Sequence, residues 1–103
     1  METRRTITPE EVRRRLEAGE ALTIIDVRED EEVAYGMIPG AQHIVMHTIP
    51  DRLDEIPKDT EVILVCRSGN RSGRVYDYLE MHGYTKTYNM EGGMLAWENE
   101  ASI

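Results

Sequence analysis

The chain has 103 residues, of which 40% are hydrophobic and 31% charged, so it fits one globular domain rather than a disordered or fibrous protein. Twenty acidic residues against 12 basic ones give a net charge of -8, which argues against nucleic acid as a partner, and no apolar stretch approaches the ~20 residues that a membrane span needs. A single cysteine excludes an internal disulfide and suits a reducing compartment, so we expect a cytoplasmic protein.

The first half of the chain begins with the pattern of a helix start. Thr8 precedes Pro9, as an N-cap precedes a first-turn proline, and Gly19 supplies a stop, so we expect a helix over 9–18. The segment 22–27 is nearly all apolar or β-branched, which is typical of a central strand in a parallel sheet covered on both faces. We then expect a short helix over 29–35, a weak strand over 43–45 and a further short helix over 49–55.

The second half continues the alternation of strands and helices. We expect a strand over 61–65, a helix over 72–82, a strand over 84–88, and a tight Gly92-Gly93 turn into 94–97. This order predicts an α/β fold, with a largely parallel sheet and helices on both faces. In such a sheet, ligands bind beyond the carboxyl ends of the strands.

The only cysteine, Cys66, lies at such a strand end. It follows the apolar run 62–65 and opens a polar segment, 67–72, that leads into a helix. Backbone amides, arginines and a helix start would all favour negative charge at this point, and they would lower the pKa of a thiol. A buried structural cysteine is the alternative, but core cysteines are not normally followed by two arginines and a turn. We therefore expect Cys66 to be a nucleophile.

A cluster of arginines accompanies this cysteine. Arg67, Arg71 and Arg74 lie within eight residues of one another in an otherwise acidic chain, which favours an anion site over a solvated helix face. An anionic sulfur held by amides and arginines needs no general base. His43 and His47 are four residues apart, but their segment is expected to be strand and turn. We therefore expect no metal and no cofactor.

Three segments, in this order, resemble the rhodanese family of sulfurtransferases. The first is Asp26-Val27-Arg28-Glu29 with Gly36-Met37-Ile38-Pro39-Gly40-Ala41, the second is Cys66-Arg67-Ser68-Gly69-Asn70-Arg71-Ser72, and the third is Glu91-Gly92-Gly93-Met94-Leu95-Ala96-Trp97. The resemblance implies a single small rhodanese-like domain over 1–103, with a five-stranded sheet, a core of about 7–98 and short tails at both ends.

The resemblance also implies an activity. The catalytic cysteine, Cys66, would take a sulfane sulfur from an anionic donor such as thiosulfate or a persulfide, become a persulfide, and pass the sulfur to a thiophilic acceptor. That acceptor would be cyanide in vitro or a cellular thiol, and a protein persulfide is a further candidate partner. The substrate-binding residues implied by position are Arg67, Ser68, Gly69, Asn70, Arg71 and Ser72.

Two alternatives remain open. A cysteine phosphatase or arsenate reductase of similar fold would have five residues between cysteine and arginine, whereas four residues separate Cys66 from Arg71 here. A binding module without catalysis would not need the cysteine. Asp26 and Arg28 are expected to form a strand-end ion pair rather than to act in catalysis, and the acidic run 29–32 is expected to match a helix dipole.

Overall fold

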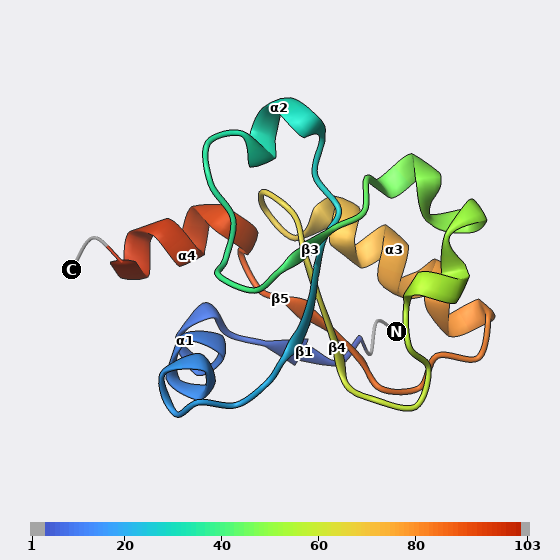
Figure 1. The fold of residues 1–103 in the computed structure, drawn as a ribbon, viewed down its shortest axis with the longest axis horizontal. Helices are drawn as coiled ribbons and strands as arrows, with labels where there is room; N and C mark the ends of the chain where they lie inside the picture. Colours follow the sequence, from blue (N-terminus) through green and yellow to red (C-terminus); the bar gives the residue numbers. More distant parts are fainter. Residues whose placement is uncertain (1–3, 102–103) are drawn as a thin grey trace.

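The computed structural model describes residues 4–101, which form a parallel sheet flanked by helices (Figure 1). The sheet has five strands in the order β1-β5-β4-β2-β3, and every neighbouring pair is parallel. The strands are β1 (Thr6–Ile7), β2 (Thr23–Asp26), β3 (Gln42–His43), β4 (Val62–Val65) and β5 (Thr87–Met90). The expected α/β class and parallel sheet are confirmed.

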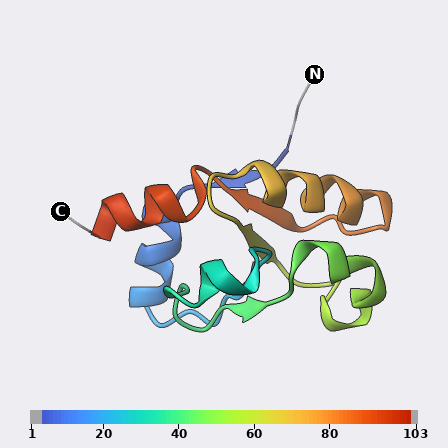
Figure 2. The same ribbon diagram turned by 90° about the horizontal axis from the view of Figure 1, so that it is seen from above.

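The helices lie on both faces of this sheet, as Figure 2 shows from above. One face carries α1 (Pro9–Glu17) and α4 (Gly93–Ala101), and the other carries α3 (Asn70–Met81) with two 3₁₀ helices, η1 (Met46–Asp51) and η2 (Leu53–Glu55). The short helix α2 (Asp30–Val33) follows β2. This arrangement leaves the loop after β4 between the starts of α3 and α4.

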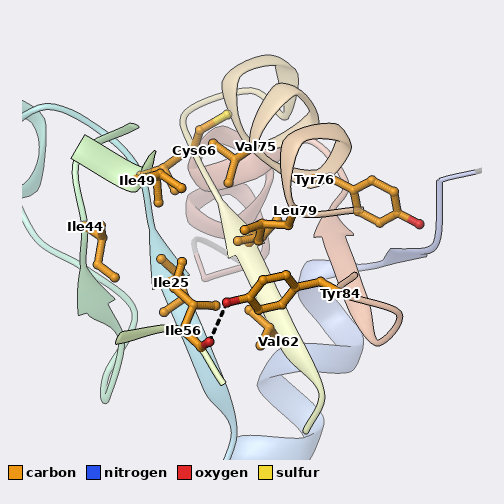
Figure 3. Close-up of a cluster of buried hydrophobic side chains, with 12 residues drawn as sticks. Ile25, Ile44, Ile49, Ile56, Val62, Cys66, Val75, Tyr76, Leu79 and Tyr84 are labelled. Carbon is orange, nitrogen blue, oxygen red and sulfur yellow. Dashed lines mark hydrogen bonds between the residues drawn. The ribbon is translucent and has the colours of Figure 1, made fainter. Parts of the chain in front are cut away.

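The alternation of side chains along the strands divides the core into two clusters. Ile63 and Val65 of β4 face α1 and α4, where they meet Val12 and Trp97. Val62, Leu64 and Cys66 point to the opposite face, together with these residues: Ile25, Val27, Ile44, Ile49, Ile56, Val75, Tyr76, Leu79 and Tyr84 (Figure 3). Cys66 is therefore fixed in orientation by the pleat of β4, on the α3 side of the sheet.

The expected helix start at Thr8 is confirmed. The Thr8 hydroxyl accepts a hydrogen bond from the Glu11 amide at 3.1 Å, which satisfies one of the unpaired amides of the first turn of α1. At the other end, Gly19 has a φ of 86°, the left-handed conformation that ends many helices.

Several boundaries differ from those expected. The helix expected over 49–55 is instead a pair of 3₁₀ helices, the first of which begins earlier, at Met46, so that Pro50, which has no amide hydrogen to donate, lies inside it. The strand expected over 84–88 begins later, at Thr87; the Tyr84 ring is buried and its hydroxyl donates to the carbonyl oxygen of Ile56 at 2.7 Å (Figure 3). The helix expected over 72–82 begins at Asn70. Within the described residues, no helix is both long enough and apolar enough to cross a membrane.

Candidate active site

Cys66 comes directly after β4, at the edge of the sheet where the neighbouring strands also end. Val65 lies beside Asp26 in the parallel register, and the amide of Val27 donates to the carbonyl oxygen of Val65 at 2.9 Å. Cys66 is fully buried, and Figure 3 shows it at one end of the cluster near Val75 and Ile49. The sulfur is therefore covered by the core on one side and by the loop that follows β4 on the other.

Hydrogen-bond donors converge on the Cys66 sulfur. The Gly69 amide donates to Sγ at 3.1 Å, and the Ser72 Oγ lies 3.3 Å from it. Burial raises the pKa of the Cys66 thiol, but hydrogen bonds from the Ser72 hydroxyl and from the amides of Ser72, Gly69 and Ser68 outweigh this effect, so the pKa lies below its usual value. The site thus favours an anionic sulfur.

Glycines allow the loop to close around the sulfur. Gly69, the N-cap of α3, has a φ of 104°, a conformation that an L side chain rarely adopts. A Cβ on Gly93 would collide with the carbonyl groups of Cys66 and Arg67. With glycine there, the amides of Met94 and Leu95 donate to those two carbonyl oxygens at 2.8 and 3.0 Å. The expected Gly92-Gly93 turn therefore also docks α4 onto the cysteine loop.

Asn89 of β5 is a site residue that the sequence analysis missed. Its Oδ1 accepts a short hydrogen bond from the Ser72 hydroxyl, and its Nδ2 donates to the carbonyl oxygen of Gly69 at 3.1 Å. The side chain thereby ties both the middle of the loop and the start of α3 to the sheet. Asn89 lies one residue beyond the strand expected over 84–88, so no signal in the sequence indicated that its side chain is buried at the site.

The three arginines of the cluster have different environments. Arg71 donates from both terminal nitrogens to the Glu32 carboxylate, at 2.7 and 2.8 Å, so it spans from α3 to α2. Arg67 is exposed and makes no ion pair with any residue in the described range 4–101. Arg74 is exposed and lines a separate, apolar hollow with Met46.

Glu32 is a second residue whose contacts were not expected. Its Oε1 also accepts from the amide of Glu29 at 2.9 Å, as part of a capping box at the start of α2. The hydrogen bonds from Arg71 lower the pKa of Glu32 to about 2, so its carboxylate is ionised at neutral pH. The acidic run 29–32 was expected only to match a helix dipole, but one of its members binds the cysteine loop.

A hollow of about 350 Å³ lies beside the cysteine loop. Its lining combines charged and apolar side chains: Arg28, Glu32, Tyr35, Arg67, Met94, Leu95 and Glu98. Tyr35 is 94% exposed and Leu95 46% exposed, so both offer apolar surface at the hollow. The hollow has the size of a small-molecule site, and Arg67, the residue after Cys66, is part of its lining.

The strand-end pair of Asp26 and Arg28 is present as expected. The Arg28 Nη2 donates to the Asp26 carboxylate at 2.8 Å and to the carbonyl oxygen of Gly36 at 2.7 Å, and both side chains are buried. The pair therefore fixes the loop after α2 to the end of β2. Among the residues that the structure describes, no group of three or more His, Cys, Asp or Glu side chains could hold a metal ion.

Most of the chain, including all of these site residues, matches a known protein family. The family model named rhodanese-like domain matches residues 8–100 of the sequence. This range includes the cysteine loop, Glu32, Asn89 and the Gly92-Gly93 turn. The chain belongs to the rhodanese-like family.

Several curated relatives of this rhodanese-like chain are named sulfurtransferases. It is 54% identical over 89 residues to the putative sulfurtransferase YtwF of Bacillus subtilis, and the aligned segment covers 86% of this chain and 85% of YtwF. It is 31% identical over 98 residues to the thiosulfate sulfurtransferase GlpE of Pseudomonas aeruginosa, which covers 95% of this chain and 87% of GlpE. These similarities support sulfurtransferase activity.

The same similarity extends to solved structures. A rhodanese-like domain protein from Staphylococcus aureus superimposes with a TM-score of 0.85 at 44% identity, over 90% of each chain. This confirms the rhodanese-like fold that the three sequence segments implied.

In this rhodanese-like domain, the expected site residues fall into two groups. The first group lies around the Cys66 sulfur: the backbone amides of Ser68 and Gly69, and both the amide and the hydroxyl of Ser72. Arg67, Asn70 and Arg71 form the outer part of the loop: the first two are exposed, and the third is engaged by Glu32.

Proposed function

We propose that the protein is a sulfurtransferase that carries a sulfane sulfur as a persulfide on Cys66. The observation that supports this most directly is the set of donors around Sγ, namely the Gly69 amide, the Ser72 hydroxyl and the loop amides that lower the thiol pKa. A thiolate is the reactive form of cysteine, and a persulfide is also anionic at neutral pH, so the same donors serve both states.

The first half-reaction loads the enzyme. The Cys66 thiolate attacks the terminal sulfane sulfur of thiosulfate; a sulfur–sulfur bond forms to the enzyme, the bond between the two sulfur atoms of thiosulfate breaks, and sulfite leaves with the electron pair. No proton has to be removed from a nucleophile that is already ionised. This is consistent with a loop in which amides, rather than a histidine, contact the sulfur.

The second half-reaction unloads it. A thiophilic acceptor attacks the outer sulfur of the persulfide, and the Cys66 thiolate is regenerated as the leaving group. Cyanide would yield thiocyanate in vitro, and a cellular thiol would yield a new persulfide. We propose thiosulfate or a low-molecular-weight or protein persulfide as donor, with the reaction taking place in the reducing cytoplasm.

Two features favour this reaction over phosphate or arsenate chemistry. Only four residues separate Cys66 from Arg71, which makes a small ring around one atom. In addition, both terminal nitrogens of Arg71 bind Glu32, so the arginine is not directed at an incoming oxyanion. A binding module without catalysis would have no use for a thiol with a lowered pKa.

The proposal is tested by the formation of thiocyanate from thiosulfate and cyanide. Wild-type protein should turn over, and Cys66→Ser should show only the uncatalysed background. The same two proteins should be compared with p-nitrophenyl phosphate, on which we expect no activity above background. Phosphatase activity that depends on Cys66, without thiocyanate formation, would replace this function with the alternative one.

A further inference from the structure

The Glu32–Arg71 pair joins two elements that are remote in sequence, directly above the reactive loop. Glu32 and Arg71 are each about 27% exposed, and the pair is bidentate. The Cys66 thiolate is close enough to stabilise the charge on Arg71 and so to raise its pKa, together with the larger effect of Glu32. A charge on Arg71 therefore acts on the same region as the sulfur, and Glu32 cancels most of it.

The other charged residues at the hollow do not compensate for the positive charge of Arg71 that Glu32 neutralises. Arg28 is engaged by the buried carboxylate of Asp26, so that pair is also neutral. Glu98 is a further acidic residue in the lining, and Glu29 is near enough to influence Arg71. This leaves Arg67 as the lining arginine that forms no ion pair within residues 4–101. The lining of the hollow therefore offers little net positive charge, whereas thiosulfate carries two negative charges.

We infer that Glu32 is a positioning residue that sets the charge specificity of sulfur donation: by neutralising Arg71, it favours monoanionic sulfane donors, such as thiosulfonates and small persulfides, over dianionic thiosulfate. This inference rests on the proposed function, since it concerns the donor for Cys66. The resemblance implies that Arg71 binds the substrate directly. In the structure Arg71 binds Glu32 instead, and on this inference the pair determines which donor is preferred.

Two donors of nearly equal shape but different charge separate the effect of donor charge from effects of donor size or of the chemical step. Thiosulfate and methanethiosulfonate share a terminal sulfane sulfur, and a methyl group replaces one oxygen in the second, which leaves one negative charge. Attack by Cys66 on the terminal sulfur expels sulfite from the first donor and methanesulfinate from the second, with the electron pair of the broken bond. The enzyme product is the same persulfide.

The experiment measures the rate constant for loading of Cys66 by each donor, followed by intact mass, and compares their ratio between variants. Glu32→Gln keeps an oxygen that can accept from the Glu29 amide but adds one net positive charge. We expect the thiosulfate to methanethiosulfonate ratio to rise about five-fold, as a unit charge at close range in partly screened surroundings predicts. Glu31→Gln, on the same helix but exposed, makes the same charge change as a control and should shift the ratio by less than about two-fold.

A variant with the opposite charge change, and the double variant, complete the test, so that the result does not depend on one variant folding well. Arg71→Gln leaves the Glu32 carboxylate unbalanced, so the ratio should fall about five-fold, and the double variant should return to within about two-fold of wild type. A folding defect would lower both loading rates and leave the ratio unchanged. Equal ratios in all variants, with both donors still loading Cys66, would overturn this inference alone. Failure of both donors to load wild-type Cys66 would overturn the proposed function as well.

Discussion

Burial and hydrogen bonding act in opposite directions on the thiol of Cys66. The residue is fully buried, which alone would favour the neutral thiol, yet the amides and the Ser72 hydroxyl make its pKa lower than usual. The Ser72 hydroxyl has only one proton and two neighbouring acceptors, the Cys66 sulfur and the Asn89 Oδ1. When it donates to the sulfur, it stabilises the thiolate.

Removing this hydroxyl should therefore raise the pKa of Cys66. We expect Ser72→Ala to shift the pH profile of iodoacetamide alkylation to higher pH and to slow alkylation at pH 7 several-fold, since less thiolate is present. Ser68→Ala is the matched control, because Ser68 affects the sulfur through its backbone amide, which the substitution retains. Equal profiles for Ser72→Ala and wild type would show that the hydroxyl donates to Asn89 in both states.

The site residues that the sequence predicts lie next to Cys66 in the chain, whereas those that it does not predict are remote from Cys66 in sequence. Cys66 and its loop are contiguous, so the prediction that they form the site rests on local signals: a strand end, small residues and a helix start. Glu32 and Asn89 reach the loop from 34 residues before and 23 residues after the cysteine. Their role depends on strand order and on the placement of α2, which the local pattern does not encode.

Among the elements, the docking of α4 on the cysteine loop depends on Gly93. Its φ of 57° and the carbonyl groups against its Cα leave no room for a side chain. We expect Gly93→Ala to lower the free energy of unfolding by at least about 2 kcal/mol, because left-handed strain and a collision with the backbone of Cys66 and Arg67 add together. Chemical denaturation monitored by circular dichroism measures this.

Gly40 provides the control for that prediction. It has a φ of 84°, but a Cβ there would meet nothing within 4 Å. Gly40→Ala should therefore cost only the conformational strain, about 1 kcal/mol. Similar losses for the two variants would contradict the proposal that close approach of α4 is the reason for glycine at position 93.

The element boundaries show where local sequence signals were insufficient. Strand β1 was not expected, because Thr6 and Ile7 are too few to form a pattern; they are held by parallel pairing with Asn89 and Met90. Helix α3 starts two residues before the expected position, since glycine at 69 takes the left-handed cap and no side-chain cap marks the start. Both misses concern tertiary pairing or backbone conformation, not hydrophobic periodicity.

At the scale of the whole molecule, the Glu32–Arg71 pair links α2 to α3 and should contribute to acid stability. The pKa of Glu32 is lowered to about 2, so its ionised form stabilises the fold above the unfolded-state value of about 4.3. That stability is lost as the pH falls from about 4.3 towards 2. The pair is partly exposed, so we expect about 1–2 kcal/mol after solvent screening.

Glu32→Gln should therefore be less stable than wild type at pH 7, and the difference should shrink as the pH approaches 2. Glu11 and Asp77 also have lowered pKa values, through Arg14 and Arg4 respectively, so the Glu32→Gln variant should still lose some stability in acid. Thermal unfolding of both proteins between pH 7 and 2 measures the difference. A constant difference across this range would mean that the pair does not couple protonation to folding.

The most direct measurement of the central claim is the intact mass of the protein after incubation with thiosulfate. The account predicts the addition of one sulfur atom to wild-type protein, its removal by cyanide with release of thiocyanate, and no addition to Cys66→Ser. A wild-type mass that does not change although thiocyanate is formed, or sulfur addition that persists in Cys66→Ser, would contradict a persulfide on Cys66.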